Sequence, residues 1–74
     1  MSFEFFKAFP PDHDGPVVEV NVRRAGQVEI PAEIRREPGG LRIRLFARSD
    51  GAAWDYDLED LVDALRRAVK VLDD

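Results

Sequence analysis

Hydrophobic residues recur at helical spacing in the last part of the chain. In the stretch DLEDLVDALRRAVKVLDD, apolar side chains return every three or four residues, which predicts an amphipathic helix over residues 58–73. Asp57 suits the N-cap position, and Glu59 and Asp60 follow in the first turn, where the helix dipole favours acidic side chains.

Upstream of this helix, apolar and polar residues alternate in four short runs separated by turn sequences. The predicted strands cover residues 17–23, 27–36, 41–48 and 53–57. The sequences RAG, EPGG and DG between these runs are typical of turns. Because side chains alternate between the two faces of a strand, a hairpin is credible only where its loop length sets apolar residues opposite each other.

The first hairpin fails this parity test with a two-residue loop, because Val22 would then face Glu29. A three-residue loop with Gly26 in the left-handed conformation sets Val22 against Val28 instead. We therefore expect the longer loop.

The other two hairpins pass the test directly. A four-residue loop over residues 37–40 sets Ile34 against Ile43, and a two-residue turn in the sequence DG sets Leu45 against Tyr56. All three loops therefore agree on one apolar face.

The sequence predicts an α+β fold with element order ββββα in a single small domain, residues 1–74. A four-stranded antiparallel β-meander occupies residues 17–57, and the C-terminal helix, residues 58–73, packs on its apolar face; residues 1–16 form a Phe-rich N-terminal segment and loop. The predicted core consists of Val18, Val20, Val22, Val28, Ile30, Ile34, Ile43, Leu45, Trp54, Tyr56, Leu58, Leu61, Val62, Leu65 and Val69.

Pro31 gives the stretch GQVEIPAEIRRE two interpretations. Within a strand, Pro31 lacks the N–H that a ladder needs, so a bulge or local break opposite Glu19 is required. At the start of a helical turn over residues 32–37, the missing N–H costs nothing. We favour the strand because three loops agree on its register.

The helical interpretation resembles SpoVT-AbrB and MazE-type swapped-hairpin DNA-binding domains, over about residues 17–44. Those domains show a strand, a glycine, a short run ending in Ile-Pro and then a brief helix with Glu and Arg. The residues that match this pattern are Gly26, Val28, Ile30, Pro31, Glu33, Ile34 and Arg35. The resemblance implies a dimeric DNA-binding antitoxin or transcription regulator, in which Arg23, Arg24, Arg35 and Arg36 contact phosphates or bases.

Charge is unevenly distributed along the chain, whose formal net charge is −4. Seven arginines and four glutamates give residues 17–48 a charge of +3, whereas residues 49–74 carry −5 and residues 1–16 carry −2. An acidic total disfavours nonspecific nucleic-acid binding, although a local cluster of arginines can still face phosphates.

Residue types that support catalysis are scarce. The chain has two serines, one histidine, no threonine and no cysteine, so no nucleophile and base pair is evident and we expect no enzyme activity. Asp12 and Asp14 flank His13, but the sequence PDHDG lacks spaced metal ligands and reads as a solvated loop. We expect no metal and no cofactor.

Two groups of residues are candidate partner contacts. The N-terminal stretch FEFFKAF is dense in phenylalanine and either covers one end of the core or adds an edge strand, or else anchors a partner. The polar face of the predicted sheet presents arginines around an aromatic residue, an arrangement that either stacks bases or forms cross-strand salt bridges. The candidate contacts are Phe3, Phe5, Phe6, Phe9, Arg35, Arg42, Arg44, Phe46 and Arg48, with Arg23 on the same face.

The leading interpretation is a small non-enzymatic protein-interaction module. It would act as an accessory, antitoxin or immunity-type protein that binds a protein partner, or as a homodimer. The absence of cysteine and of a secretory-type N-terminus fits a cytoplasmic location, and no apolar run is long enough to cross a membrane. DNA binding through the swapped-hairpin resemblance is the alternative.

Overall fold

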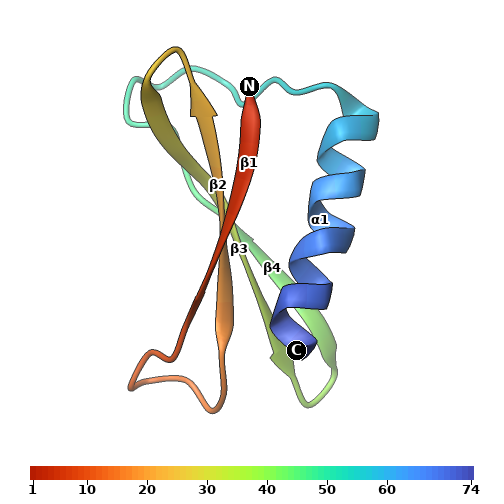
Figure 1. Ribbon diagram of the computed structural model, residues 1–74. Coiled ribbons are helices and arrows are strands. Elements are labelled where there is room, and N and C mark those ends of the chain that lie inside the picture. Colours follow the sequence, from red (N-terminus) through yellow and green to blue (C-terminus); the bar gives the residue numbers. More distant parts are fainter.

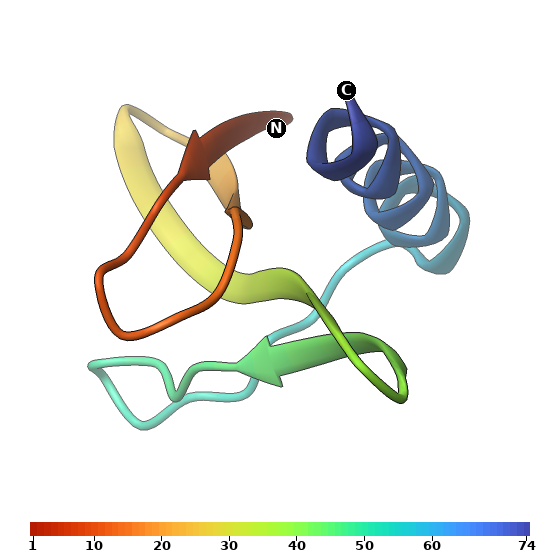
Figure 2. The same ribbon diagram turned by 90° about the horizontal axis from the view of Figure 1, so that it is seen from below.

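The computed structural model describes all 74 residues and confirms the predicted α+β class (Figure 1). Four antiparallel strands form one sheet in the order β1-β2-β3-β4, followed by a C-terminal helix. The elements are β1 (Ser2–Ala8), β2 (Val17–Arg24), β3 (Gln27–Glu37), β4 (Gly40–Leu45) and α1 (Leu58–Asp73). The sheet is strongly twisted, and α1 lies against one of its faces (Figures 1 and 2).

The N-terminal segment supplies one of the four strands. In β1, Phe3 pairs with Val22 and Phe5 pairs with Val20, so the alternation in SFEF aims two phenylalanines at the helix side of the sheet. The N-terminus therefore belongs to the sheet and its core, which is one of the two roles expected for it.

The predicted strand over residues 53–57 is wrong. The expected two-residue turn does not form, because the Gly51 N–H donates to the Arg48 carbonyl at 3.2 Å and the Asp50 carboxylate accepts from the Ala52 N–H at 3.0 Å. These local bonds compete with a strand ladder. Residues 46–57 instead form an irregular segment that crosses one end of the sheet to reach α1 (Figure 1).

The first hairpin has a two-residue turn, Ala25 and Gly26, and not the three-residue loop that we expected from the pattern of apolar residues. Ala25 and Gly26 both have positive φ, 51° and 79°, as in a type I′ turn, and Val22 does pair with Glu29. The predicted pairing of Val22 with Val28 is therefore wrong.

A β-bulge in the middle of β3 changes which residues of the strand face the helix side of the sheet. The register shifts between Val20 and Val22, so that Ile30 and Pro31 together lie opposite Asn21. The predicted defect at Pro31 is thus confirmed, although it lies opposite Asn21 rather than Glu19. Before the bulge, Val28 and Ile30 turn away from the helix side and are exposed, which corrects their assignment to the core.

The second hairpin has the predicted register. Ile34 pairs with Ile43 and Ala32 with Leu45. Pairing extends to Glu37, opposite Gly40, so the loop is shorter than the expected four residues.

Helix α1 begins as predicted but faces the sheet with a different stripe. The Asp57 carboxylate accepts from the Asp60 N–H at 3.0 Å, which caps the first turn. The fully buried helix residues are Ala64, Ala68 and Leu72, which recur every four residues. Ala68 and Leu72 pack with Val18 and Val20 of β2, and the predicted core residues Leu65 and Val69 pack partly buried at the edge of this cluster. Small alanine side chains let the helix approach the sheet closely.

Four further core assignments need correction. Leu58 is 72% exposed and Leu45 is 71% exposed, and Val62 and Ile43 also lie largely in solvent. The cause is the position of α1, whose backbone lies close to β1, β2 and β3 but not to β4. Figure 2 shows α1 on the β1 side of the sheet, well apart from β4.

Neighbouring phenylalanines in β1 test the role of the N-terminal strand. Phe5 packs against the core beneath the Arg67 guanidinium, whereas Phe6 is 51% exposed on the other face. Phe5→Ala should lower the free energy of unfolding by about 2 kcal/mol, and Phe6→Ala by less than about 0.5 kcal/mol. Urea denaturation measures both; equal effects would contradict this placement of β1.

The first turn offers a stabilising substitution. Ala25 is the one non-glycine residue with positive φ, a conformation that costs an alanine more than an asparagine. Ala25→Asn should therefore raise the free energy of unfolding by about 0.5–1 kcal/mol in urea denaturation. Ala53→Asn in the irregular segment serves as the control and should leave stability unchanged.

Candidate functional site

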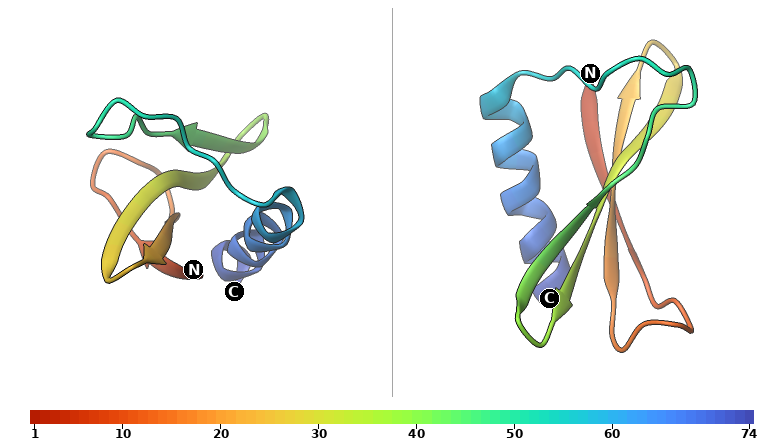
Figure 3. Two further views of the ribbon diagram at one scale, coloured as in Figure 1. Left: turned by 90° about the horizontal axis from the view of Figure 1, so that it is seen from above. Right: turned by 180° about the vertical axis from the view of Figure 1, so that it is seen from behind.

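An open apolar groove lies between α1 and β4. Its first half is a cavity of about 330 Å³ whose apolar walls come from the two elements and from β3 beneath them. Its lining residues are Ile34, Leu41, Arg42, Ile43, Val62, Leu65, Arg66 and Val69. Figure 3 shows how α1 and β4 are arranged, seen from two further sides.

The second half of the groove adjoins the first, since Ile43 and Leu65 line both. It is a cavity of about 460 Å³ that reaches from β4 to the irregular segment before α1. Its lining residues are Val20, Pro31, Ala32, Ile43, Leu45, Trp54, Asp55, Tyr56, Leu61 and Leu65. The two halves form one continuous apolar surface that the chain itself leaves open.

The charged residues at the groove are mostly arginines without partners. Arg42 and Arg66 line its first half, and neither forms an ion pair or a side-chain hydrogen bond. Arg44 on the outer face of β4 is likewise exposed and unpaired. The rim near α1 and β4 is therefore basic, which contrasts with the acidic total charge of the chain.

The other arginines predicted as partner contacts are engaged within the chain. Arg35 is half-buried, with its Nε 2.7 Å from a Glu37 oxygen and its Nη1 3.6 Å from Glu33. Arg48 leaves the outer face and binds Asp50 at 2.8 Å. Of the predicted basic stripe, Arg42 and Arg44 alone remain open to a partner.

The aromatic candidates are divided between the interior and solvent. Phe3 and Phe5 pack against the core, whereas Phe6 and Phe9 are exposed. Phe46 is half-buried, and its carbonyl accepts a hydrogen bond from the Trp54 indole at 2.6 Å. The structure therefore does not gather the phenylalanines into one contact surface.

The arginines of the swapped-hairpin alternative lie at opposite ends of the sheet. Arg23 binds Glu4 at 2.8 Å, which raises the pKa of Arg23 through the hydrogen bond and the charge of Glu4, and Arg24 lies 5.3 Å from the Tyr56 ring centre. Arg36 holds Asp73 of α1 through two bonds of 2.8 and 2.9 Å. Residues 32–37 continue β3 without a break.

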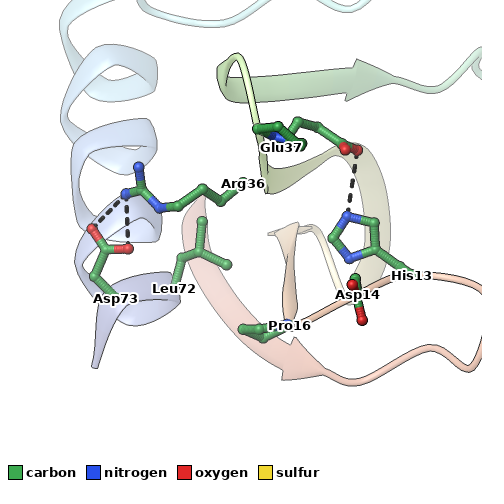
Figure 4. A pocket seen from close by; sticks show the side chains of 8 residues that line it. His13, Asp14, Pro16, Arg36, Glu37, Leu72 and Asp73 are labelled. Carbon is green, nitrogen blue, oxygen red and sulfur yellow. Dashed lines mark hydrogen bonds and ion pairs between the residues drawn. The ribbon is translucent and has the colours of Figure 1, made fainter.

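A polar pocket of about 520 Å³ lies at the opposite end of the molecule from the irregular segment (Figure 4). His13 Nε2 is 3.4 Å from a Glu37 oxygen, and its Nδ1 is 3.1 Å from the Gly15 carbonyl. The hydrogen bond from Arg35 is the main reason that the pKa of Glu37 is lowered. No three histidine, aspartate or glutamate side chains converge to form a metal site, and within this pocket His13 pairs with Glu37 and Arg36 pairs with Asp73.

A buried polar cluster borders the groove at Tyr56. Because the two-residue turn sets Glu29 opposite Val22, Glu29 points toward the helix side, where its carboxylate lies 3.6 Å from Arg48. One Glu29 oxygen and the Tyr56 hydroxyl are buried without hydrogen-bond partners. Burial raises the pKa of Tyr56, the Glu29 charge raises it further, and Arg24 and Arg48 oppose the shift.

Sequence reasoning missed this cluster and most of the groove. It placed Glu29 on the outer face, because the two-residue turn and the bulge were not anticipated together. It also assigned the groove residues Ile43, Leu45 and Val62 to a closed core. The sequence did contain a signal for the groove, namely two adjacent apolar stripes on α1. A helix that only covers its own sheet needs a single stripe.

The Tyr56 hydroxyl provides a test of the cluster. Glu29→Gln should lower the pKa of Tyr56, because the carboxylate that disfavours the phenolate is removed; Glu33→Gln on the outer face should not. Absorbance titration of the phenolate measures both. Since the pKa is raised in the folded state, the unfolded chain ionises first, and wild-type stability should fall as the pH rises from about 10 through the folded value.

A comparison with protein-family models finds no match, and searches of curated proteins and of solved structures find none either. The one helix is too short and too polar to span a lipid bilayer. The geometry of the chain itself must therefore support any functional assignment.

Proposed function

We propose that this chain is a small non-enzymatic protein-binding module whose contact surface is the apolar groove between α1 and β4. The observation that carries the proposal is the half-covered sheet. A helix about 10 Å across covers roughly two strands spaced about 4.8 Å apart, so four strands need more than one helix. α1 covers the β1 side and leaves β4 bare.

The surface area of the chain supports the same proposal. The chain exposes 5253 Å², whereas a folded monomer of 8.4 kDa typically exposes roughly 4,600 Å². The excess of about 600 Å² approaches the roughly 800 Å² that each partner contributes to a standard interface. A partner in the groove would bring the exposed surface to an ordinary value.

The residues available for chemistry support a non-enzymatic role. The single histidine binds the Gly15 carbonyl and Glu37, and neither serine forms a hydrogen bond to it. The groove contains apolar side chains and arginines rather than an acid and base pair. The absence of cysteine supports a cytoplasmic location as part of this proposal.

DNA binding remains a weaker alternative, supported by the swapped-hairpin resemblance of residues 17–44. Arg23, Arg35 and Arg36 each form an ion pair within the chain, and binding phosphates would require these pairs to break. Duplex affinity that falls steeply with salt would support this alternative.

Two exposed isoleucines provide a matched test of the protein-binding groove. Ile43 lines the groove and is 46% exposed, whereas Ile30 lies outside it and is 41% exposed. Ile43→Glu should weaken association with the protein that the wild-type chain binds by at least about tenfold, because it places a charge in an apolar contact. Ile30→Glu should have little effect.

The measurement is affinity purification of tagged variants from the native host, followed by titration of whatever species is recovered, including the chain itself. Urea denaturation confirms that each variant is folded. Equal loss of binding by both variants, or loss by Ile30→Glu alone, would overturn the assignment of the groove.

A further inference from the structure

We propose that the partner of this chain contributes an extended segment of alternating apolar and acidic residues, which joins the sheet as a fifth strand antiparallel to β4. The inference rests on the proposed function, because it names the class of partner and the way in which it binds. It follows from the free edge of β4, the bare apolar side chains of this strand and the arginines between them.

The edge of β4 that faces away from β3 carries backbone groups without a strand to bond, since β4 is the last strand of the sheet. The Phe46 N–H donates to the Pro31 carbonyl at 2.9 Å, and antiparallel ladder bonds recur at every second residue. The backbone groups of Arg42 and Arg44 therefore bond β3, whereas those of Ile43 point to the free edge. The residues whose backbone groups point to this edge are Leu41, Ile43 and Leu45.

The opposite edge of the sheet is less open. It is formed by β1, whose Lys7 ammonium donates to the Asp74 carbonyl at the end of α1. The Arg67 guanidinium of α1 also lies 5.3 Å from the ring centre of Phe5. A strand from another chain therefore meets less obstruction at β4 than at β1.

The side chains of the β4 edge residues are apolar and exposed. Leu41 and Ile43 are each 46% exposed, and Leu45 is 71% exposed. Ile43 pairs with the buried Ile34, so these side chains lie on the helix side of the sheet, where they form one wall of the groove. An added strand places every second side chain beside this wall, and apolar residues fit those positions.

The arginines without partners lie beside the same edge. Of the nine arginines in the chain, only three have neither an ion pair nor a side-chain hydrogen bond, namely Arg42, Arg44 and Arg66. Two of them alternate with the apolar residues of β4, and the third lines the groove on α1. Acidic residues of an added strand opposite Arg42 and Arg44 would form cross-strand ion pairs with them.

β3 does not neutralise the two arginines of β4. Arg42 lies opposite Arg35 in the ladder, where it meets a like charge. Glu33 lies opposite Arg44, but its carboxylate pairs with Arg35 at 3.6 Å. The charge of β4 is therefore open to acidic groups from another chain.

Other occupants satisfy this edge less well. A second β4, antiparallel and centred on Ile43, would set Arg42 opposite Arg44 of the second copy, with like charges facing each other twice. A helix in the groove would cover the apolar side chains but leave the backbone groups of the edge without partners. An acidic strand satisfies the backbone, the apolar side chains and the arginines together, as in other complexes formed by strand addition.

A designed peptide tests the proposal. The probe has seven residues and blocked ends, with glutamate and valine in alternation, and is titrated into the full isotopically labelled chain while amide exchange is followed by NMR. The Ile43 N–H should exchange readily in the free chain and slow by about tenfold at a peptide concentration ten times Kd. The Arg42 and Arg44 N–H groups should be protected in both states, because they bond β3.

Two methylated peptides test the strand pairing. In the antiparallel register, valines opposite the edge residues exchange hydrogen bonds with β4, while the amides of the glutamates face solvent. N-methylation of the central valine should therefore weaken binding by about tenfold or more. N-methylation of the neighbouring glutamate is the matched control and should have little effect.

Charge reversal tests the chemistry of the partner. Arg44→Glu should weaken binding of the glutamate peptide by about fivefold or more and allow a peptide of alternating lysine and valine to bind instead. Lys70→Glu makes the same charge change at an exposed position of α1 outside the groove, and should leave both affinities within about twofold of wild type. Urea denaturation confirms that both variants are folded.

The outcomes distinguish this inference from the proposed function. A glutamate peptide that does not bind, or that binds without protecting the Ile43 N–H, overturns strand addition at β4. A host protein whose binding is lost in Ile43→Glu would still keep the groove as a protein-binding site. Equal binding of the glutamate and lysine peptides overturns the acidic partner, and loss of binding on methylation of the glutamate alone overturns the antiparallel direction.

Discussion

The structure depends on one extra residue in β3. A two-residue turn at Gly26 starts β3 with the wrong parity, so Glu29 points to the helix side. The bulge at Ile30 and Pro31 reverses that parity, and only after it do apolar residues of β3 face the core. The bulge also limits pairing with β4, because Pro31 accepts from the Phe46 N–H at 2.9 Å but has no N–H to return. The chain leaves the sheet at this point and crosses to α1.

The position of α1 follows from a match of large and small side chains. β1 contributes Phe3 and Phe5, whose bulk lies on the helix side of the sheet. On the facing side of α1, Ala64 and Ala68 have small side chains, which leave room for the phenylalanines while the helix lies close to the sheet. A helix so placed covers the β1 side, and one helix is too narrow to reach β4 as well. The groove is therefore a direct consequence of how the core is packed.

Local patterns in the sequence were sufficient to predict the α+β fold class. The helix, its Asp57 cap and the register of Ile34 with Ile43 rest on nearby residues and were predicted. The predicted strand over residues 53–57 was wrong because the Asp50 carboxylate accepts a local hydrogen bond from the Ala52 N–H, and a pattern of alternating residues does not reveal such a bond. The rotation of α1 was also missed, since two apolar stripes compete for the sheet and Phe5, more than fifty residues away in sequence, helps to decide between them. Such choices depend on tertiary packing, so the candidate site was less predictable than the fold.

β4 exposes both a backbone edge and an apolar face, and these favour different kinds of association. Pairing through an edge adds strands without limit, because each added copy presents another edge. Arg42 and Arg44 alternate with Ile43 and Leu45 along β4, so a second β4 paired at this edge would meet their like charges, and Arg42 also lines the rim of the groove. The alternation along β4 thus discourages open-ended sheet growth and leaves the apolar side chains of this strand at the groove.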